Sequence, residues 1–201
     1  MREHSIRDLE VRAGEDGTVT FDGLNWSSFD GLTVTGAATL SGAAVSLDSN
    51  GGNILFSSTL AGGSQDLTIA AGTGAGTTTF TGNVSALGDG TGAALTVASG
   101  VTGLVSFQGT VGANSGLVSN DNSGATRFDQ DVTLANGDTG SDFAGTVTFD
   151  GLNWSGFDGL TIGGAATLSG SAVSLDSNGA NIDFSDTLAG GGQDLDRKSV
   201  V

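Results

Sequence analysis

The stretch GTVTFDGLNWSSFDGLTV at residues 17–34 returns as GTVTFDGLNWSGFDGLTI at residues 145–162. The match extends over residues 17–67 and 145–195, and eight of the 51 paired positions differ: Ser28/Gly156, Val34/Ile162, Thr35/Gly163, Ala43/Ser171, Gly52/Ala180, Leu55/Asp183, Ser58/Asp186 and Ser64/Gly192. Large apolar residues such as Phe21, Trp26 and Phe56 are kept, whereas most changes exchange small or polar residues. A copied packing pattern is typical of arrays whose units bury their apolar faces against one another, so the duplication predicts a repeat architecture.

Composition and charge exclude several classes of partner. The 201 residues include 36 Gly but no Pro and no Cys, so a disulfide framework and thiolate metal sites are excluded. Within residues 13–195 a single basic residue, Arg127, stands against eighteen carboxylates. Nucleic acid and anionic membranes are therefore not expected as partners. No apolar run approaches the ~20 residues of a membrane span, and residues 1–16 lack the apolar core of a signal peptide, so any export signal is expected outside this chain.

Short β-prone runs with alternating apolar residues recur between turn signals. They occupy residues 19–21, 32–34, 54–56, 67–69, 79–80, 95–97, 104–107, 132–134, 147–149, 160–162 and 182–184. Between them lie dipeptides that tolerate positive φ in tight turns: Asn50-Gly51, Asp89-Gly90, Asn136-Gly137 and Asn178-Gly179. After Gly17 no stretch favours a helix, because Gly, Ser, Thr and β-branched residues are too dense. The sequence therefore predicts an all-β chain.

A second recurring unit is Phe followed four residues later by an aliphatic residue. It occurs as Phe56/Leu60, Phe80/Val84, Phe107/Val111, Phe128/Val132 and Phe184/Leu188. Positions i and i+4 of one extended strand share a face, so both side chains are expected in one core. The Phe residues at 56, 80, 107, 128 and 149 are spaced by 24, 27, 21 and 21 residues, an interval that suits one coil of a β-solenoid.

Stacking of coils is required by the energetics of a single coil. One buried Phe contributes roughly 1.5–3 kcal/mol, whereas ordering about 22 residues costs on the order of 30 kcal/mol. We therefore expect a right-handed parallel β-helix, with tandem β-sandwich modules as the alternative. The duplicated block of 51 residues, two or three coils, would lengthen the rod, which the interval predicts to have roughly eight to ten coils.

The predicted organisation has three parts. Residues 1–16 form a cap or linker with a distinct composition, in which Ile6, Leu9 and Val11 suit a cap strand, a short helix or no regular element. Residues 17–195 form the β-solenoid. Residues 196–201 break the repeat, because the first copy continues TIAAG where the second reads DRKSVV. One choice of codons for this tail resembles the start of a common sequencing adapter, which favours an artefact; a real charged terminus that blunts an open solenoid end is the alternative.

The runs DLTIAAGTGAGTTTFTGNVSALG (66–88) and ALTVASGVTGLVSFQGTVG (94–112) resemble the repeat regions of large bacterial surface proteins of the filamentous-haemagglutinin and autotransporter-passenger type. The resemblance covers about residues 17–195. It implies a right-handed parallel β-helix, export across an outer membrane and a role in adhesion. The secretion domain and the membrane barrel of that family are not found in this sequence, so it shows no transport route.

No catalytic, cofactor-binding or metal site is predicted. His4 is the sole histidine, which argues against a Ser/His/Asp triad. Asp pairs are plentiful, but Arg127 alone could help to orient a sugar substrate, so turn and surface roles are expected for them. The run GTGAGTTT (72–79) lacks the Lys of a phosphate-binding loop and is interpreted as a turn.

Calcium is the cofactor that the residues leave open, because Asp and Asn in Gly-rich turns supply oxygen ligands. DSNGGN (48–53) and DSNGAN (176–181) fail the EF-hand pattern, and GGSQDL (62–67) places Asp one position too early for the nonapeptide calcium repeat. Ordinary Asn-Gly turns explain the same residues.

Aromatic, sequon and threonine patterns each have a plainer interpretation. Trp26 and Trp154, with Phe29 and Phe157, could form sugar platforms, but alternation with Leu24 favours the core. Residues 25–27, 83–85 and 153–155 are glycosylation sequons, informative only in a host that modifies them. The threonine pairs Thr18/Thr20 and Thr77/Thr79 invite an ice-binding interpretation, which the uneven coil lengths disfavour.

The sequence favours a non-catalytic structural or adhesive stalk segment of an exported bacterial surface protein. The expected partners are neighbouring coils of a larger chain, and a glycan or protein of a host or cell surface. A calcium-dependent β-sandwich array and a polysaccharide-cleaving β-helix are the alternatives.

Overall fold

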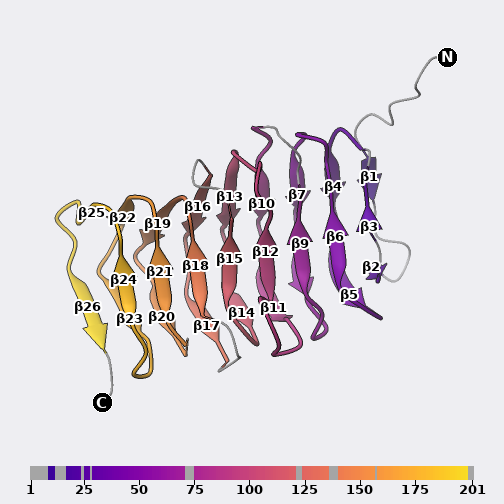
Figure 1. The fold of residues 1–201 in the computed structure, drawn as a ribbon. Coiled ribbons are helices and arrows are strands. Elements are labelled where there is room, and N and C mark those ends of the chain that lie inside the picture. The colour runs from indigo at the N-terminus through magenta and orange to yellow at the C-terminus, as the bar shows by residue number, and fades with distance from the viewer. Residues whose placement is uncertain are drawn as a thin grey trace.

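The chain is a column of stacked β-coils (Figure 1). The computed structural model describes residues 9–11, 17–23, 25–27, 29–70, 75–120, 124–135, 140–156 and 158–198. These residues form three sheets of nine, nine and eight strands, and all of the pairings between neighbouring strands are parallel. Successive strands of the chain pass from one sheet to the next, and every third strand returns to the same sheet.

Each sheet is made of every third strand of the chain. Sheet 1 contains β1 (Leu9–Val11), β4 (Leu32–Val34), β7 (Ile54–Phe56), β10 (Thr78–Phe80), β13 (Leu104–Phe107), β16 (Ala125–Phe128), β19 (Thr146–Asp150), β22 (Ala166–Ser169) and β25 (Leu188–Ala189). Sheet 2 contains β2 (Thr18–Asp22), β5 (Ala37–Ser41), β8 (Leu60–Ala61), β11 (Val84–Leu87), β14 (Val111–Ala113), β17 (Val132–Leu134), β20 (Asn153–Ser155), β23 (Val173–Asp176) and β26 (Leu195–Lys198). Sheet 3 contains β3 (Asn25–Trp26), β6 (Val45–Leu47), β9 (Leu67–Ile69), β12 (Leu95–Val97), β15 (Leu117–Ser119), β18 (Ser141–Phe143), β21 (Leu160–Ile162) and β24 (Ile182–Phe184).

The prediction of a parallel β-helix is confirmed, with about eight turns. The alternative of tandem β-sandwich modules is wrong, because sandwiches are built from two antiparallel sheets, whereas the strands here pair in parallel. Most strands are two to five residues long and alternate between buried and outward positions, so each contributes one or two side chains to the interior.

The phenylalanine column that the spacing predicted runs through the middle of the interior. Phe56, Phe80, Phe107, Phe128 and Phe149 occupy one register position of sheet 1 and are each at most 1% exposed. The first four rings stack nearly parallel, with centroids 5.2, 4.9 and 5.1 Å apart along the series. The Phe128 and Phe149 rings lie 6.3 Å apart, with the Trp154 indole edge-on to both. Offset or edge-on rings add to the stabilisation from buried area.

The aliphatic partner is buried as expected in four of the five pairs, whereas Leu188 is 39% exposed, and in no pair do the two residues share a strand. Phe56 ends β7 in sheet 1, whereas Leu60 begins β8 in sheet 2, and residues 57–59 form the corner between them. The interpretation of i and i+4 as one extended strand is therefore wrong. A strand, a short corner and a second strand also turn both side chains inward, which is why the spacing still marks core positions.

The duplicated block is rotated by one sheet between its two copies. The strand TVTFD is β2 of sheet 2 in the first copy and β19 of sheet 1 in the second. The next strand, containing Asn-Trp, is β3 of sheet 3 and then β20 of sheet 2. The two copies are offset by 17 strands, from β2 to β19, which is not a whole number of three-strand coils. The sequence of a strand therefore specifies an inward and an outward face, but not a particular sheet.

The ends of the predicted solenoid also contribute strands. Residues 9–11 of the predicted cap form β1, which pairs with β4, so this part of the cap is a strand and not a helix. Residues 195–198 form β26, which pairs with β23 and thus includes the start of the DRKSVV tail. Ile6 and residues 199–201 lie outside the described residues.

Candidate functional site

A shallow groove of about 730 Å³ lies on sheet 3, on the side of the rod. Its lining comes from β15, β18, β21 and the corners that precede β18, β21 and β24: Val118, Gly140, Ser141, Asp142, Asp158, Gly159, Leu160, Thr161, Gly179, Ala180 and Asn181. Two carboxylates and no base line this groove. Its chemistry suits hydroxyl or cationic ligands better than anions.

One of the eight differences between the copies lies in the lining of this groove. In the first copy a Cβ atom on Gly52 would lie 1.4 Å from the carbonyl oxygen of Asp30, so the two corners touch backbone to backbone. The second copy has Ala180 at this position, and Ala180 lines the groove together with Asp158. The Gly52/Ala180 difference is visible in the sequence, but nothing in the sequence indicates that Ala180 lines a groove.

A second hollow, of about 610 Å³, lies at the C-terminal end of the rod. It is lined by Ser177, Gly179, Ala180, Asn181, Ile182, Asp183 and Arg197. The guanidinium of Arg197 donates a 3.0 Å hydrogen bond to the carbonyl oxygen of Ile182 and lies 5.9 Å from the centroid of the Phe184 ring. This hollow therefore places a cation among mainly polar lining residues, with Ala180 and Ile182 as the apolar ones.

The DSNG sequences form the turns that were predicted for them. The Asp48 carboxylate accepts a hydrogen bond of 3.0 Å from the Asn50 amide, and Asp176 accepts one of 3.1 Å from Asn178. Asn50 and Asn178 have φ values of 48° and 49°, the left-handed region that Asn tolerates. The serines between them, Ser49 and Ser177, are buried and each donates to a carbonyl oxygen of the same turn. The Asp and Ser side chains of these turns therefore have a structural role that does not require a bound ion.

Two carboxyl groups have shifted pKa values with opposite causes. Desolvation raises the pKa of Asp66, and the Asp89 carboxylate adds repulsion, although an amide hydrogen bond from Asp89 opposes both. Hydrogen bonds from the hydroxyl and the backbone amide of Thr91, at 2.7 and 2.8 Å, lower the pKa of Asp89. Asp66 belongs to the GGSQDL segment, which was compared above with the calcium repeat. The carboxylate that acts on Asp66 is that of Asp89.

The described residues contain no group of three or more His, Cys, Asp or Glu side chains that could hold a metal ion. Across the same part of the chain, no helix has the length and apolar character needed to cross a membrane. That the chain has no catalytic or metal site stays a prediction. Whether it binds calcium stays open.

The tryptophans weighed as sugar platforms belong to the core or to its end. Trp154 is fully buried, and Phe29 is 3% exposed. Trp26 is half-buried in the first coil, with its ring edge-on to Phe21 at 5.4 Å. The core interpretation is therefore confirmed for Trp154 and Phe29. Leu24 and Phe157 lie outside the described residues.

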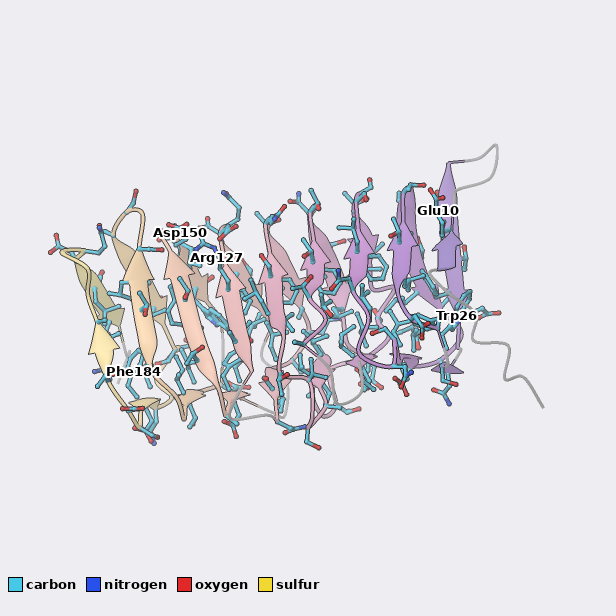
Figure 2. The ribbon with its side chains drawn as sticks, turned by 90° about the horizontal axis from the view of Figure 1, so that it is seen from above. Glu10, Trp26, Arg127, Asp150 and Phe184 are labelled. Carbon is cyan, nitrogen blue, oxygen red and sulfur yellow. The ribbon has the colours of Figure 1, made fainter. Side chains whose placement is uncertain are left out.

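Arg127, which sequence analysis singled out as the one base of the body, is held by two carboxylates on the outside of sheet 1. Its guanidinium forms ion pairs with Asp129 of the following corner and with Asp150 of β19, the next strand of sheet 1 (Figure 2). Engaged in this way, Arg127 links neighbouring coils. The pairing was not evident in the sequence because Asp150 is 23 residues away.

The remaining candidates occupy exposed or structural positions. Asn25, Asn83 and Asn153 of the sequons are exposed, and the Asn83 side chain accepts a 3.1 Å hydrogen bond from the Thr110 amide of the next coil. Of the GTGAGTTT run, residues 75–79 lead into β10 and Thr78 is buried. His4 and residues 72–74 lie outside the described residues.

Comparison of the chain with protein-family models, with curated proteins and with solved structures finds no match.

Proposed function

We propose that this chain is a non-catalytic stalk segment of an exported bacterial surface protein, in which it serves as a structural or adhesive rod. The observation that carries the proposal is the unbroken column of stacked rings from Phe56 to Phe149, which fills the interior from coil to coil. A filled interior favours a rigid rod that holds an attached domain at a fixed distance, over a fold that encloses a ligand.

The surface of the rod supports the same role. Outward positions of sheet 3 follow one another in register as Ser46, Thr68, Thr96, Val118, Asp142 and Thr161. Small hydroxyl and acidic side chains with a net charge of −16 favour solubility and disfavour lateral aggregation. The row is too mixed for a regular ice-binding ladder, because Val118 and Asp142 interrupt it.

The duplication provides a direct test of the stalk. Because residues 145–195 repeat residues 17–67, residues 68–195 can be appended after Leu195 with the local sequence preserved. Each added unit contains 17 strands, or five and two-thirds coils, and should lengthen the rod by about 27 Å at roughly 4.8 Å per coil.

The measurement is the height of a reporter domain, carried by the chain on a cell-surface anchor, for one, two and three units. A linear increase in height supports a stalk, whereas growth with the square root of the number of units indicates a flexible chain and contradicts it.

The alternatives give different results with the same protein. A calcium-dependent protein should melt several degrees higher in millimolar calcium than with a chelator, while the stalk predicts the same melting temperature in both. Cleavage of acidic polysaccharides that is lost with Asp142→Asn or Asp158→Asn would replace the stalk by an enzyme that uses the sheet 3 groove.

A further inference from the structure

Both copies of the duplicated block contain a tight turn with Asn-Gly at its centre. The turn joins β6 to β7 in the first copy and β23 to β24 in the second. The amide of Gly52 donates a 2.8 Å hydrogen bond to the carbonyl oxygen of Ser49, and the amide of Ala180 donates one of 3.0 Å to that of Ser177. The φ values of Asn and Gly are 48° and 90° in one turn and 49° and 95° in the other, which identifies type I′ turns. A further pair, Asn136-Gly137, lies outside the described residues.

An Asn-Gly pair can undergo a reaction that needs no enzyme. The amide nitrogen of Gly attacks the side-chain Cγ of the preceding Asn, because Gly has no Cβ to obstruct the approach. A bond from nitrogen to Cγ forms, the bond from Cγ to Nδ2 breaks, and the proton lost by the Gly nitrogen leaves with ammonia. Water then opens the cyclic imide at either carbonyl and leaves aspartate or isoaspartate. Asn is among the thermolabile residues of proteins.

The attacking nitrogen is available in both turns, but the geometry of the turn prevents ring closure. Gly51 and Gly179 donate no amide hydrogen bond to any residue that the structure describes, and Asn50 and Asn178 are exposed. Ring closure requires the Cβ of Asn and the nitrogen of Gly to lie nearly eclipsed about the Cα–C bond. A type I′ turn sets ψ of its first central residue at about +30°, which holds these two atoms about 150° apart. The nitrogen therefore points away from Cγ in the wound coil.

Contacts within and between coils hold the first turn in this geometry. The Asp48 carboxylate accepts a hydrogen bond of 3.0 Å from the amide of Asn50. The buried Ser49 hydroxyl donates one of 2.6 Å to a carbonyl oxygen of the same turn. A Cβ atom on Gly76 would lie 2.5 Å from the carbonyl oxygen of Gly51, so the next coil rests directly on the turn. The reactive geometry is therefore reached only when the coil opens.

We propose that Asn50 and Asn178 are sites of spontaneous deamidation that the wound coil protects, so that the chain is modified only while these coils are open. The two products differ in their effect. Aspartate tolerates the left-handed region and suits the turn. Isoaspartate adds one carbon atom to the main chain, at a corner where a Cβ on Gly52 would already lie 1.4 Å from the carbonyl oxygen of Asp30. A chain that stays unwound therefore loses the ability to wind this corner.

The rate of conversion of each Asn, in the folded full chain and in urea, tests the protection. Peptide mass spectrometry follows conversion in one mildly alkaline buffer. Asn50 and Asn178 should convert at least about tenfold more slowly in the folded chain, because only its open fraction reacts. Asn83 is the matched control, since it precedes the β-branched Val84. It should stay unmodified in both conditions.

Asp48→Ala tests the turn within a single molecule. The substitution removes the hydrogen bond to the amide of Asn50, so the folded-state rate at Asn50 should rise about two- to tenfold while the rate at Asn178 is unchanged. Asp176→Ala should do the reverse, since Asp176 accepts the equivalent bond from Asn178. In urea both variants should react like the original chain. Circular dichroism confirms that each variant is folded.

Rewinding separates the two products. Chains converted in urea are fractionated and diluted into native buffer, and circular dichroism measures the β-structure that returns. Asn50→Asp should wind like the original chain, whereas chains with isoaspartate at position 50 should not. Equal rates at Asn50 in the folded chain and in urea would overturn the proposal. So would an equal acceleration of both sites by Asp48→Ala, or full rewinding of the isoaspartate chains.

Discussion

Glycine at the corners of the solenoid lets successive coils approach to backbone contact. A Cβ atom on Gly76 would lie 2.3 Å from the carbonyl oxygen of Gly52, and one on Gly103 would lie 2.0 Å from that of Gly76. Gly52, Gly76 and Gly103 thus form a stack at one corner, and each neighbour in it is a backbone atom that cannot rotate away. Close approach, and not positive φ, is the reason for glycine here.

Gly76→Ala should destabilise the protein by about 1–3 kcal/mol, because a methyl group must push two coils apart. Chemical denaturation monitored by circular dichroism measures the loss. Gly190→Ala is the control, since its Cβ would meet nothing closer than 3.6 Å. Equal effects of the two substitutions would contradict the role of backbone contact.

Asp66 and Asp89 should make opposite contributions to the pH dependence of stability. Burial raises the pKa of Asp66 above its ordinary 3.8, so its ionised form costs stability at neutral pH, and the cost disappears as the pH falls towards 3.8. Asp66→Asn should therefore raise the melting temperature at pH 7 and have little effect near pH 3.5.

Hydrogen bonds from Thr91 lower the pKa of Asp89, so its stabilising contribution is present above 3.8 and is lost as the pH falls through the lowered value. Asp89→Asn should reduce the melting temperature at pH 7, and this difference should shrink in acid. Calorimetry between pH 3 and pH 7 measures both variants. A gain from Asp89→Asn at pH 7 would contradict the assignment.

Strands of nearly identical sequence differ in burial according to their place in the stack. Phe56 and Phe184 have the same neighbours in sequence apart from Leu55/Asp183 and Ser58/Asp186. Phe56 is 1% exposed and stacks on Phe80, whereas Phe184 is half-buried beside Arg197. The contribution of a strand to stability therefore depends more on the coil that covers it than on its own sequence.

Phe56→Ala should cost about 3–5 kcal/mol, the usual range for a buried aromatic residue. Phe184→Ala in the duplicate strand should cost less than half as much, because its ring is covered on one side. Urea denaturation of the two variants at low protein concentration measures the difference. Similar losses would show that the end coil is packed like the middle.

The sequence was sufficient to predict the all-β solenoid and its interior column, because the Phe spacing repeats at the coil interval, but the eleven predicted runs match fewer than half of the 26 strands. It did not reveal that Phe56 and Leu60 belong to different sheets, since a single strand and a tight corner both turn positions i and i+4 inward. The ion pair between Arg127 and Asp150 and the groove beside Ala180 depend on contacts between coils. Such contacts follow from register, which spacing alone does not fix.

At the scale of the whole molecule, the rotation of the duplicated block by one sheet is possible because the three sheets are nearly equivalent. Thr33 and Thr161 are equivalent in sequence, but Thr33 lies in sheet 1 and Thr161 in sheet 3. A stalk that tolerates this can be extended by blocks of any whole number of strands. Residues on its surface then change face from copy to copy.

The distance between spin labels at Ser46→Cys and Thr161→Cys tests the stacked column most directly, because the chain has no other cysteine. The two residues lie on the outside of sheet 3, linked by the register series through Thr68, Thr96, Val118 and Asp142. Five strand spacings place their backbones about 24 Å apart. A narrow distribution near that value is the predicted result of pulsed electron paramagnetic resonance, and a broad distribution or one centred beyond about 40 Å would contradict the continuous solenoid.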